Sequence, residues 1–297
     1  MGLGGHRRLR STVLLFQADR TVHEMTTQPK TILVGAVAYH PRVVTVWEGF
    51  RDYFRRGHLD VDYVLFSNYE RQIDALLLGE IDIAWNTNTA YVSAEHQIGG
   101  SAQVLGMRDV DASYATVLVV RGGGNESKNI AQLAGNVLAL GSRDSGHAAI
   151  LPLHYLGRQG VDLGRVNLLR FDTDLGKHGD TGDSEARVLK AVSSGDAWAG
   201  AVGDATWLIS KAQGNSDTEG LEVIWRSPTY YHCSFTARPD FSADLAGRWL
   251  ELLLGMDYGD ASLRHYMDLE GVKRWLPGDK AGYRDLTEAM RRQGYLD

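Results

Sequence analysis

The sequence predicts an α/β protein with two similar lobes that face each other across a cleft. Short apolar runs rich in β-branched residues alternate with segments of helical periodicity. One strand–helix–strand unit is echoed later in the chain, and both units end in a polar turn. Short connections of this kind favour parallel strands. Polar residues at the carboxyl ends of such strands are where α/β folds bind their ligands.

The first lobe is expected to begin near Thr31. The run "TILVGAVAY" (31–39) has the apolar, β-branched character of a buried strand. The next segment, "VVTVWEGFRDYFRRG", predicts a helix that stops at Gly57. Its apolar face is made by Val43, Val46, Trp47, Phe50 and Phe54. The run "VDYVLF" then predicts a second strand.

The clearest unit is "SNYERQIDALLLGEIDIAWNTNTAYV". Ser67 and Glu70 have the spacing of a capping box, and Gly79 is typical of a helix end. The strand "IDIAW" follows and ends in the polar turn 86–88. The later echo, "DSEARVLKAVSSGDAWAGAVGDATW", repeats helix, glycine, strand and a polar turn at 203–204.

Two loops set the expected limits of the lobes. The Gly-rich segment 121–129 follows the strand "ATVLVV", and the polar loop 212–220 precedes the strand "LEVIW". We therefore expect lobe 2 to span 119–224, and lobe 1 to consist of 31–118 plus 225–297. The helical patterns near the end of the chain are expected to pack on lobe 1.

The composition excludes several classes of protein. The 297 residues are 43% hydrophobic and 23% charged, with a formal net charge of −6, so no overall basic field points to nucleic acid. Cys233 stands alone, which leaves no cysteine pair or cysteine metal cluster within these residues. No apolar run approaches the roughly 18 residues of a membrane helix, so membrane insertion is not expected. Nucleophile-elbow, P-loop and dinucleotide motifs are missing too.

Residues 1–30 carry basic residues and an apolar stretch of only Val13 to Phe16. A secretory signal needs roughly 7–15 apolar residues, and no lipobox cysteine is present here. Taken literally, the sequence predicts a cytoplasmic protein whose first 30 residues are a disordered arm. If the true start differs from Met1, for example at Met25 or upstream, a periplasmic or extracellular location stays open.

The segment "LALGSRDSGHAAILP" (138–152) has the pattern of an anion site. An apolar run stops at Gly141, a polar loop follows, and a helix-like stretch resumes from Gly146. Backbone amides at a helix N-terminus favour an anion. Arg143 is the cation of this loop; it would pair with the anion, pair with Asp144, or point to solvent.

Five segments in order resemble the phosphate/phosphite/phosphonate solute-binding proteins of ABC transporters. They are "YERQIDALLLGEIDIAWNTNTAYV", "LALGSRDSGHAAILP", "EARVLKAVSSGDAWAGAV", "WRSPTYYHCSFTARPDF" and "DLEGVKRWLPGDKAGYRDLTEAM". The resemblance implies the type II periplasmic-binding-protein fold, with a mixed, mainly parallel sheet flanked by helices in each lobe. It also implies binding of a small anionic solute by hinge closure, with no cofactor. An ABC permease would be the partner if the protein is exported.

The same resemblance implies a set of cleft residues. They are Tyr69, Trp85, Asn86, Thr87, Asn88 and Tyr91 from the first segment, Ser145, Gly146 and His147 from the second, Asp183, Ser184 and Glu185 from the third, and Asp204 at the second strand tip. The family usually has a hydroxyl-rich run where Ser145, Gly146 and His147 stand. Because an imidazole titrates near neutral pH, a phosphonate-like or other organic anion is favoured over inorganic phosphate.

Several residues keep two interpretations. Tyr39 and His40 stand at the carboxyl end of the first strand, a position that favours a role in the cleft. Tyr230 and His232, where the chain returns between lobes, either stack on a ligand or fill the crossover. Ser145 also fits a plain helix N-cap. No metal site is our main expectation, although a loop carrying His178, Asp180 and Asp183 leaves divalent metal binding as an alternative.

The function itself is left between three classes. His147 fits a ligand donor, a general acid/base, or a helix residue bonded to a nearby loop. Binding of the anion as a solute-binding or sensing protein is the main prediction. The alternative is a cytoplasmic lyase, decarboxylase or dehydratase of a small carboxylate that uses His147 as acid/base. A sensor that passes lobe closure to a protein partner is the third.

Overall fold

The computed structural model describes residues 1–2, 30–123 and 128–296. The chain divides into two units, Met1–Lys30 and Thr31–Asp297, and the second contains all the helices and strands described below. The prediction made for residues 1–30, an arm or a different start, falls outside the described residues.

The first sheet contains six strands in the spatial order β11-β4-β10-β3-β1-β2. Strand β1 lies between β2 and β3 and is parallel to both, whereas β10 is antiparallel to β3 and β4. The strands are β1 (Ile32–Val37), β2 (Val61–Phe66), β3 (Ile83–Asn86), β4 (Gln103–Arg108), β10 (Ser234–Ala237) and β11 (Trp275–Leu276).

The second sheet contains five strands in the order β7-β6-β8-β5-β9. Strand β6 is parallel to β7 and β8, and β5 is antiparallel to β8 and β9. The strands are β5 (Thr116–Arg121), β6 (Val137–Leu140), β7 (Asn167–Arg170), β8 (Ala199–Gly203) and β9 (Leu221–Arg226). Both sheets are mixed as predicted, but "mainly parallel" overstates the parallel share. The strands that follow a crossing between sheets, β5 and β10, run against their neighbours.

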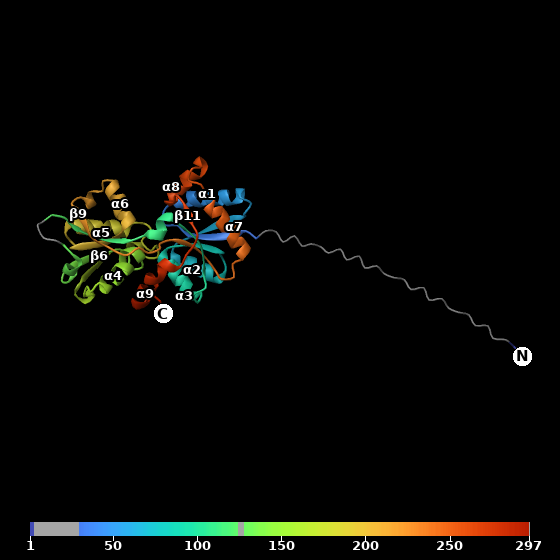
Figure 1. Ribbon diagram of the computed structural model, residues 1–297, viewed down its shortest axis with the longest axis horizontal. Coiled ribbons are helices and arrows are strands. Elements are labelled where there is room, and N and C mark those ends of the chain that lie inside the picture. Colours follow the sequence, from blue (N-terminus) through green and yellow to red (C-terminus); the bar gives the residue numbers. More distant parts are fainter. Residues whose placement is uncertain (3–29, 124–127, 297) are drawn as a thin grey trace. The chain divides into compact units, whose positions relative to one another are not determined.

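The chain crosses between the sheets twice, after β4 and after β9. An antiparallel bridge between Tyr114 and Tyr230 joins the two crossings. The second sheet therefore takes its strands from 116–226, and the expected lobe limits of 119 and 224 both fall inside strands. Helices α5 (Asp183–Ser194) and α4 (Leu151–Arg158) lie on opposite sides of this sheet (Figure 1). Residues of each helix belong to a separate apolar cluster with side chains of the sheet.

Helix α1 (Arg42–Arg56) follows the predicted pattern, since all five residues of its expected apolar face are buried. It packs with α7 (Ala243–Leu254) and α8 (Ala261–Glu270) in the core of the first sheet. Phe54 stacks on Trp249 with ring centroids 4.3 Å apart.

Helix α2 (Tyr69–Leu78) begins one residue later than predicted. Its N-cap is Asn68, whose side-chain oxygen accepts from the Arg71 amide at 2.9 Å, and not Ser67. The capping box with Glu70 is therefore wrong, because Glu70 stands one position too close to the cap to reach back. The helix ends as predicted at Gly79, whose φ of 74° is the left-handed conformation that glycine favours.

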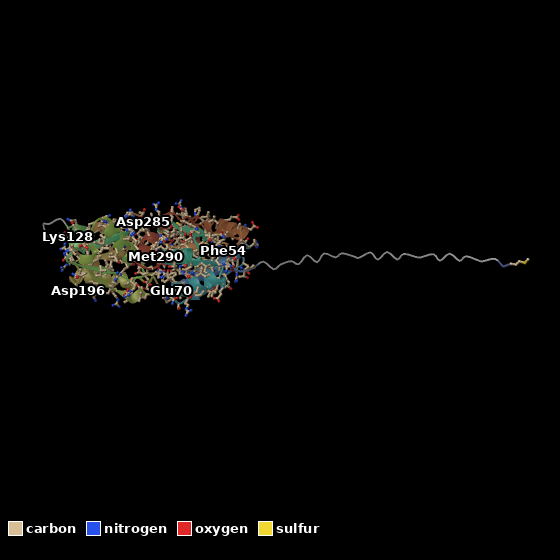
Figure 2. All side chains as sticks on the ribbon, turned by 90° about the horizontal axis from the view of Figure 1, so that it is seen from below. Phe54, Glu70, Lys128, Asp196, Asp285 and Met290 are labelled. Atoms are coloured by element: carbon tan, nitrogen blue, oxygen red, sulfur yellow. The ribbon has the colours of Figure 1, made fainter. Side chains whose placement is uncertain are left out.

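The remaining helices are α3 (Asn88–Gln97), α6 (Asp204–Ala212) and α9 (Arg284–Arg292). Helix α9 was expected on the first lobe but packs against α3 and α4 together. Its Leu286 and Met290 share a core with Tyr91 on α3 and Tyr155 on α4. Figure 2 marks Met290 in this shared core and Phe54 in the core of the first sheet. Among the described residues, no helix has the combined length and apolarity that crossing a bilayer requires.

Candidate functional site

A cavity of about 620 Å³ lies between the two sheets and the crossings that join them. Trp85 on β3 and Arg108 at the end of β4 line it from the first sheet. Glu185 on α5 lines it from the second sheet. The predicted cleft residues found on its wall are Tyr39, Trp85, His147, Glu185, Asp204 and His232.

His147 and Glu185 form a buried pair on one side of the cavity. Each side chain is 3% exposed, and the imidazole Nε2 lies 3.2 Å from a Glu185 oxygen. The carboxylate also accepts from the Gly203 amide at 2.6 Å and from the Thr206 hydroxyl at 2.9 Å. Burial disfavours the charged form of both side chains. The attraction between His147 and Glu185 outweighs this effect of burial in each of them. The pKa of His147 is raised and that of Glu185 is lowered.

A second charged cluster lies across the cavity. The Arg108 guanidinium donates to both oxygens of Asp111, at 2.5 and 2.9 Å, and to the Glu270 backbone carbonyl at 2.7 Å. Burial opposes ionisation of Asp111, but Arg108 overrides it and lowers the pKa of that carboxyl to about 2. Burial raises the pKa of Glu270 to about 7, against the attraction of Arg108. Arg108 also lies over the Trp85 ring, 5.4 Å from its centroid.

Two histidine rings meet at the cavity with their centroids 5.2 Å apart, those of His147 and His232. His232 stacks on Tyr114 at 4.5 Å, and its Nδ1 lies 3.4 Å from Asp111 and 3.0 Å from the Cys233 sulfur. Within the described part of the chain, Nδ1 of His147 and Nε2 of His232 are buried without a hydrogen-bond partner. Buried nitrogens of this kind are normally paired, so a bound polar group would satisfy them.

The loop 172–182 of the second sheet covers the first sheet's strand tip. The amide of Tyr69 donates to the Gly176 carbonyl at 2.9 Å, and the Tyr69 hydroxyl bonds to Asp180. His178 Nδ1 lies 2.7 Å from the Thr87 hydroxyl and 2.9 Å from that of Thr89. Tyr69 and Thr87, both predicted to meet the ligand, are buried under this loop in the described arrangement.

Two more predicted residues are held close by contacts between the sheets. The Asn88 amide nitrogen donates to the Tyr231 carbonyl at 3.3 Å. Gly146 lies so near Asn88 that a Cβ at Gly146 would overlap the amide group. Ser145 is the N-cap of the helical turn Gly146–Ile150 and accepts from the Ala148 amide at 3.2 Å, as one of its two interpretations had it.

The other predicted residues lie away from the cavity wall. The Asn86 side-chain oxygen accepts from the Gln72 amide at 2.8 Å, and the Tyr230 hydroxyl bonds to that of Thr116 at 2.8 Å. The ring of Tyr91 packs on that of Tyr283, with the ring centroids 4.2 Å apart. These three and Ser184 are buried in the protein.

Two further predicted residues lie on the surface. His40 is exposed and accepts from the Arg42 amide at 3.1 Å, while Asp183 is exposed and pairs with Arg187 at 3.0 Å. His40 was predicted from its place at the end of the first strand, and Asp183 from the family resemblance. Neither observation says which way a side chain turns.

The three side chains suggested for a metal do not converge. His178 bonds to Thr87 and Thr89, Asp180 to Tyr69, and Asp183 to Arg187. Arg143 pairs with Asp172 at 2.9 Å, so it takes neither Asp144 nor solvent as its main partner.

The sequence profile of a family described as "ABC transporter, phosphonate, periplasmic substrate-binding protein" matches residues 34–283. The chain belongs to this family. A curated relative, the probable ABC transporter phosphite binding protein PhnD1 of Prochlorococcus marinus (strain MIT 9301), is 22% identical over 279 residues. The match covers 90% of this chain and 91% of the relative.

Solved structures share the fold of the family member described here. PhnD1 in complex with methylphosphonate gives a TM-score of 0.69 at 21% identity, covering 90% of this chain and 99% of that one. XAC2383 from Xanthomonas citri bound to ATP gives a TM-score of 0.70 at 16% identity, and the match covers 90% of this chain and 98% of that one. The periplasmic aliphatic sulphonate binding protein SsuA from Escherichia coli gives a TM-score of 0.60 at 16% identity, and the match covers 91% of this chain and 94% of that one. Both mixed sheets and their flanking helices match this type II periplasmic-binding-protein architecture.

Arg108 and Glu270 form the charged side of this family member's cavity and were not among the residues predicted from the sequence. Each carried a usable signal. Arg108 ends the run "QVLGMR", and a cation directly after a buried strand marks the ligand-bearing edge of a sheet. Glu270 lies within "DLEGVKRW", one of the five segments of the resemblance, but it was not singled out there.

Proposed function

We propose that this member of the phosphonate-binding family binds a small organic oxyanion of the phosphonate type in the cavity between its sheets. One observation carries the proposal: two buried imidazoles line the cavity, and each leaves one nitrogen without a partner among the described residues. An oxyanion with several acceptor oxygens can satisfy both nitrogens together.

The His147–Glu185 pair supports donation to an anion. Glu185 raises the pKa of His147 against the effect of burial, which makes the imidazolium more accessible than in a free histidine. An imidazolium donates from both nitrogens. Its Nε2–H faces Glu185, so Nδ1–H is left for a ligand oxygen. A charge-assisted bond of this kind is stronger than one between neutral groups.

The charges around the cavity support an organic substituent on the anion. Arg42, Arg108 and Arg226 line it, but so do Asp180, Glu185, Asp204 and Glu270. Asp204 already pairs with Arg226, and Arg108 with Asp111. These carboxylates all have partners in the protein, but as a group they disfavour a second anionic group on the ligand. They suit a neutral or amine-bearing substituent, and a cavity of about 620 Å³ has room for one.

Tyr69, Thr87, Asn88 and Ser145 remain proposed contacts for the form in which the lobes are apart. In the described arrangement the loop 172–182 or the opposite sheet covers them. Hinge opening would expose these groups and admit the ligand, and closure would bring His147 and His232 onto it.

Calorimetric titration with methylphosphonate, 2-aminoethylphosphonate, phosphite and phosphate tests this proposal. We expect an organic phosphonate to bind more tightly than phosphate. His147→Gln, which keeps a neutral donor, should weaken that binding by roughly tenfold or more, because hydrogen bonds to charged groups contribute about 1.5–3 kcal/mol. His265→Gln, on the exposed face of α8, is the matched control. Equal affinity of His147→Gln and the unchanged protein contradicts the proposed role.

A second candidate function rests on the same pair. A buried His–Glu couple on the wall of a cavity also has the arrangement of a general acid/base, which favours an enzyme acting on a small carboxylate. Proton NMR of hydroxy- and dicarboxylates incubated with the protein separates the two functions. A binding protein returns each compound unchanged, whereas product formation that His147→Gln abolishes identifies a lyase, decarboxylase or dehydratase.

We also propose an ABC permease as the protein's partner, with a location outside the cytoplasm. The family description, a periplasmic substrate-binding component, supports both. Fractionation of cells that express the gene from its natural start is the test. Recovery with the cytoplasmic fraction alone contradicts the proposed transport role and leaves sensing or catalysis.

A further inference from the structure

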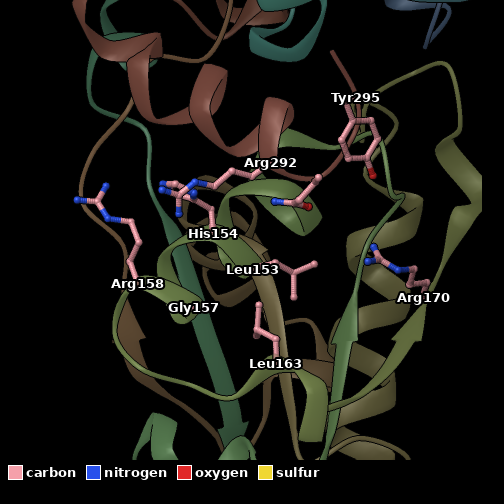
Figure 3. A pocket seen from close by; sticks show the side chains of 9 residues that line it. Leu153, His154, Gly157, Arg158, Leu163, Arg170, Arg292 and Tyr295 are labelled. Atoms are coloured by element: carbon pink, nitrogen blue, oxygen red, sulfur yellow. The ribbon is translucent and has the colours of Figure 1, made fainter. Parts of the chain in front are cut away.

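A second cavity of about 480 Å³ lies between α4, the end of β7 and the segment that follows α9. It shares no lining residue with the cavity between the sheets. Figure 3 shows Leu153 and Leu163 in its middle, His154, Arg158 and Arg292 on one side, and Arg170 on the other. We call it the α4–α9 pocket.

Two of its three arginines are already neutralised. Arg158 lies 3.5 Å from Asp285, and Arg292 lies 2.7 Å from Glu288. Arg170 is different, because its Nη1 is buried and makes no hydrogen bond to any described residue. A buried guanidinium nitrogen without an acceptor is costly, and an anion in the pocket would supply an acceptor for Nη1.

His154 adds an unpaired group to the same pocket. Its side chain is 7% exposed, and its Nε2 has no partner in the described part of the chain. Nitrogen and oxygen atoms of His154, Asp285 and Glu288 lie within 4.8 Å of one another, which would also suit a metal ion. The guanidinium groups on both carboxylates oppose a cation, so an anion fits the local charge better.

The floor of the pocket is apolar. Leu153 and Leu163 face it, and Gly157 between them contributes no side chain. A pocket with an apolar floor and a few polar groups is typical of small-molecule sites.

We propose that the α4–α9 pocket is a second ligand site, which takes a small amphiphilic organic monoanion. Its carboxylate or sulfonate pairs with Arg170, its apolar body lies on Leu153 and Leu163, and a polar atom meets His154. The site is independent of the solute in the cavity between the sheets.

Titration with 1-anilinonaphthalene-8-sulfonate, an amphiphilic monoanion that fluoresces in apolar surroundings, tests the site. The titration uses the full chain with EDTA and excess methylphosphonate, so that neither metal nor the other cavity contributes. We expect saturable binding at one site. No saturable binding under these conditions, as when methylphosphonate displaces the dye, overturns the proposal.

Two substitutions locate the bound sulfonate. Gly157→Leu fills the pocket, because a Cβ there meets Leu163 at 3.4 Å in ordinary contact, and should abolish binding. Gly247→Leu, in α7 with open space around it, is the matched control and should bind normally. Leucine also favours a helix over glycine, so unfolding of the pocket variant is not expected. Equal binding by both variants overturns the proposal.

Arg170→Met removes the charge but keeps the length of the side chain. This substitution should weaken binding of the sulfonate dye by about tenfold or more, as expected from the loss of a charge-assisted hydrogen bond. Arg165→Met, on the exposed turn before β7, should leave binding unchanged. N-phenyl-1-naphthylamine, which lacks the sulfonate, should bind Arg170→Met and the unchanged protein alike. If Arg170→Met leaves sulfonate binding unaltered, the pocket does not select an anion.

Discussion

The strand-tip turns of the two sheets follow the same local pattern but have different surroundings. At the first tip, Thr87 caps α3, is fully buried and contacts His178 of the covering loop. At the second tip, Asp204 begins α6, pairs with Arg226 and lines the cavity. Similar strand ends therefore differ in access because of what a distant segment lays over them. In the described arrangement the two tips thus share a local pattern but not the same access to the cavity.

The largest loss of stability is expected when the hydrogen bonds that hold the second tip are removed. Glu185 accepts from the Gly203 amide and the Thr206 hydroxyl and faces His147. Glu185→Ala would leave these groups unpaired in the interior, at a cost of about 3–5 kcal/mol in the free energy of unfolding. Urea denaturation followed by circular dichroism measures this loss.

Two variants make that measurement specific to Glu185. Glu185→Gln keeps an acceptor for Gly203 and should lose less. Asp183→Ala, which removes an exposed pair with Arg187 on the same helix, should cost less than about 1 kcal/mol. Similar losses for Glu185→Ala and Asp183→Ala would show that the buried carboxylate does not hold the turn.

A smaller effect is expected at the first tip. Gly146→Ala puts a Cβ into the Asn88 amide and should cost about 1–3 kcal/mol, as overpacking does. Asn88→Ala should relieve part of that cost, which a double-mutant cycle detects as a coupling energy. Gly247→Ala, in open space on α7, is the control and should stabilise slightly. Additive effects of the first two substitutions contradict a direct contact between residues 146 and 88.

The smallest effect is a pH dependence confined to the second tip. Because the pKa of His147 is raised by folding, its contribution to stability is complete below the unfolded value of about 6.5. That contribution is lost as the pH rises through the higher folded value. Glu185, whose pKa is lowered, contributes above about 4.3 and loses its contribution as the pH falls through the folded value.

Urea midpoints from pH 5 to 8 for the unchanged protein and His147→Gln measure this dependence. Glu270 titrates in the same range, since burial raises its pKa to about 7, and it lowers stability as the pH rises. The difference between the two proteins removes the Glu270 contribution. A difference that grows with increasing pH contradicts the assigned direction.

Local features of this fold could be predicted because neighbouring residues determine them. The buried face of α1 follows from helical periodicity, and the ends at Gly79 and Gly195 follow from glycine's tolerance of a positive φ. The first cap was misplaced by one residue, since Ser67 and Asn68 are both good N-caps and the backbone selects between them.

Long-range contacts could not be predicted from the same patterns. Nothing local to 172–182 says that His178 will contact Thr87, and Arg108 meets Glu270 across 162 residues of sequence. Nor does the apolar face of α9 say that it will be shared by α3 and α4. The family resemblance supplied the order of the cleft motifs, while their side-chain directions depend on packing between distant segments.

The contact between Gly146 and Asn88 also constrains how this protein can change by mutation. The family resemblance places a hydroxyl-bearing residue at position 146, yet any side chain there now collides with the amide of Asn88. A side chain at position 146 therefore requires the Asn88 side chain to move or to be shortened, and shortening it removes the bond to Tyr231. The cost of restoring a hydroxyl at position 146 thus depends on which residue stands at position 88.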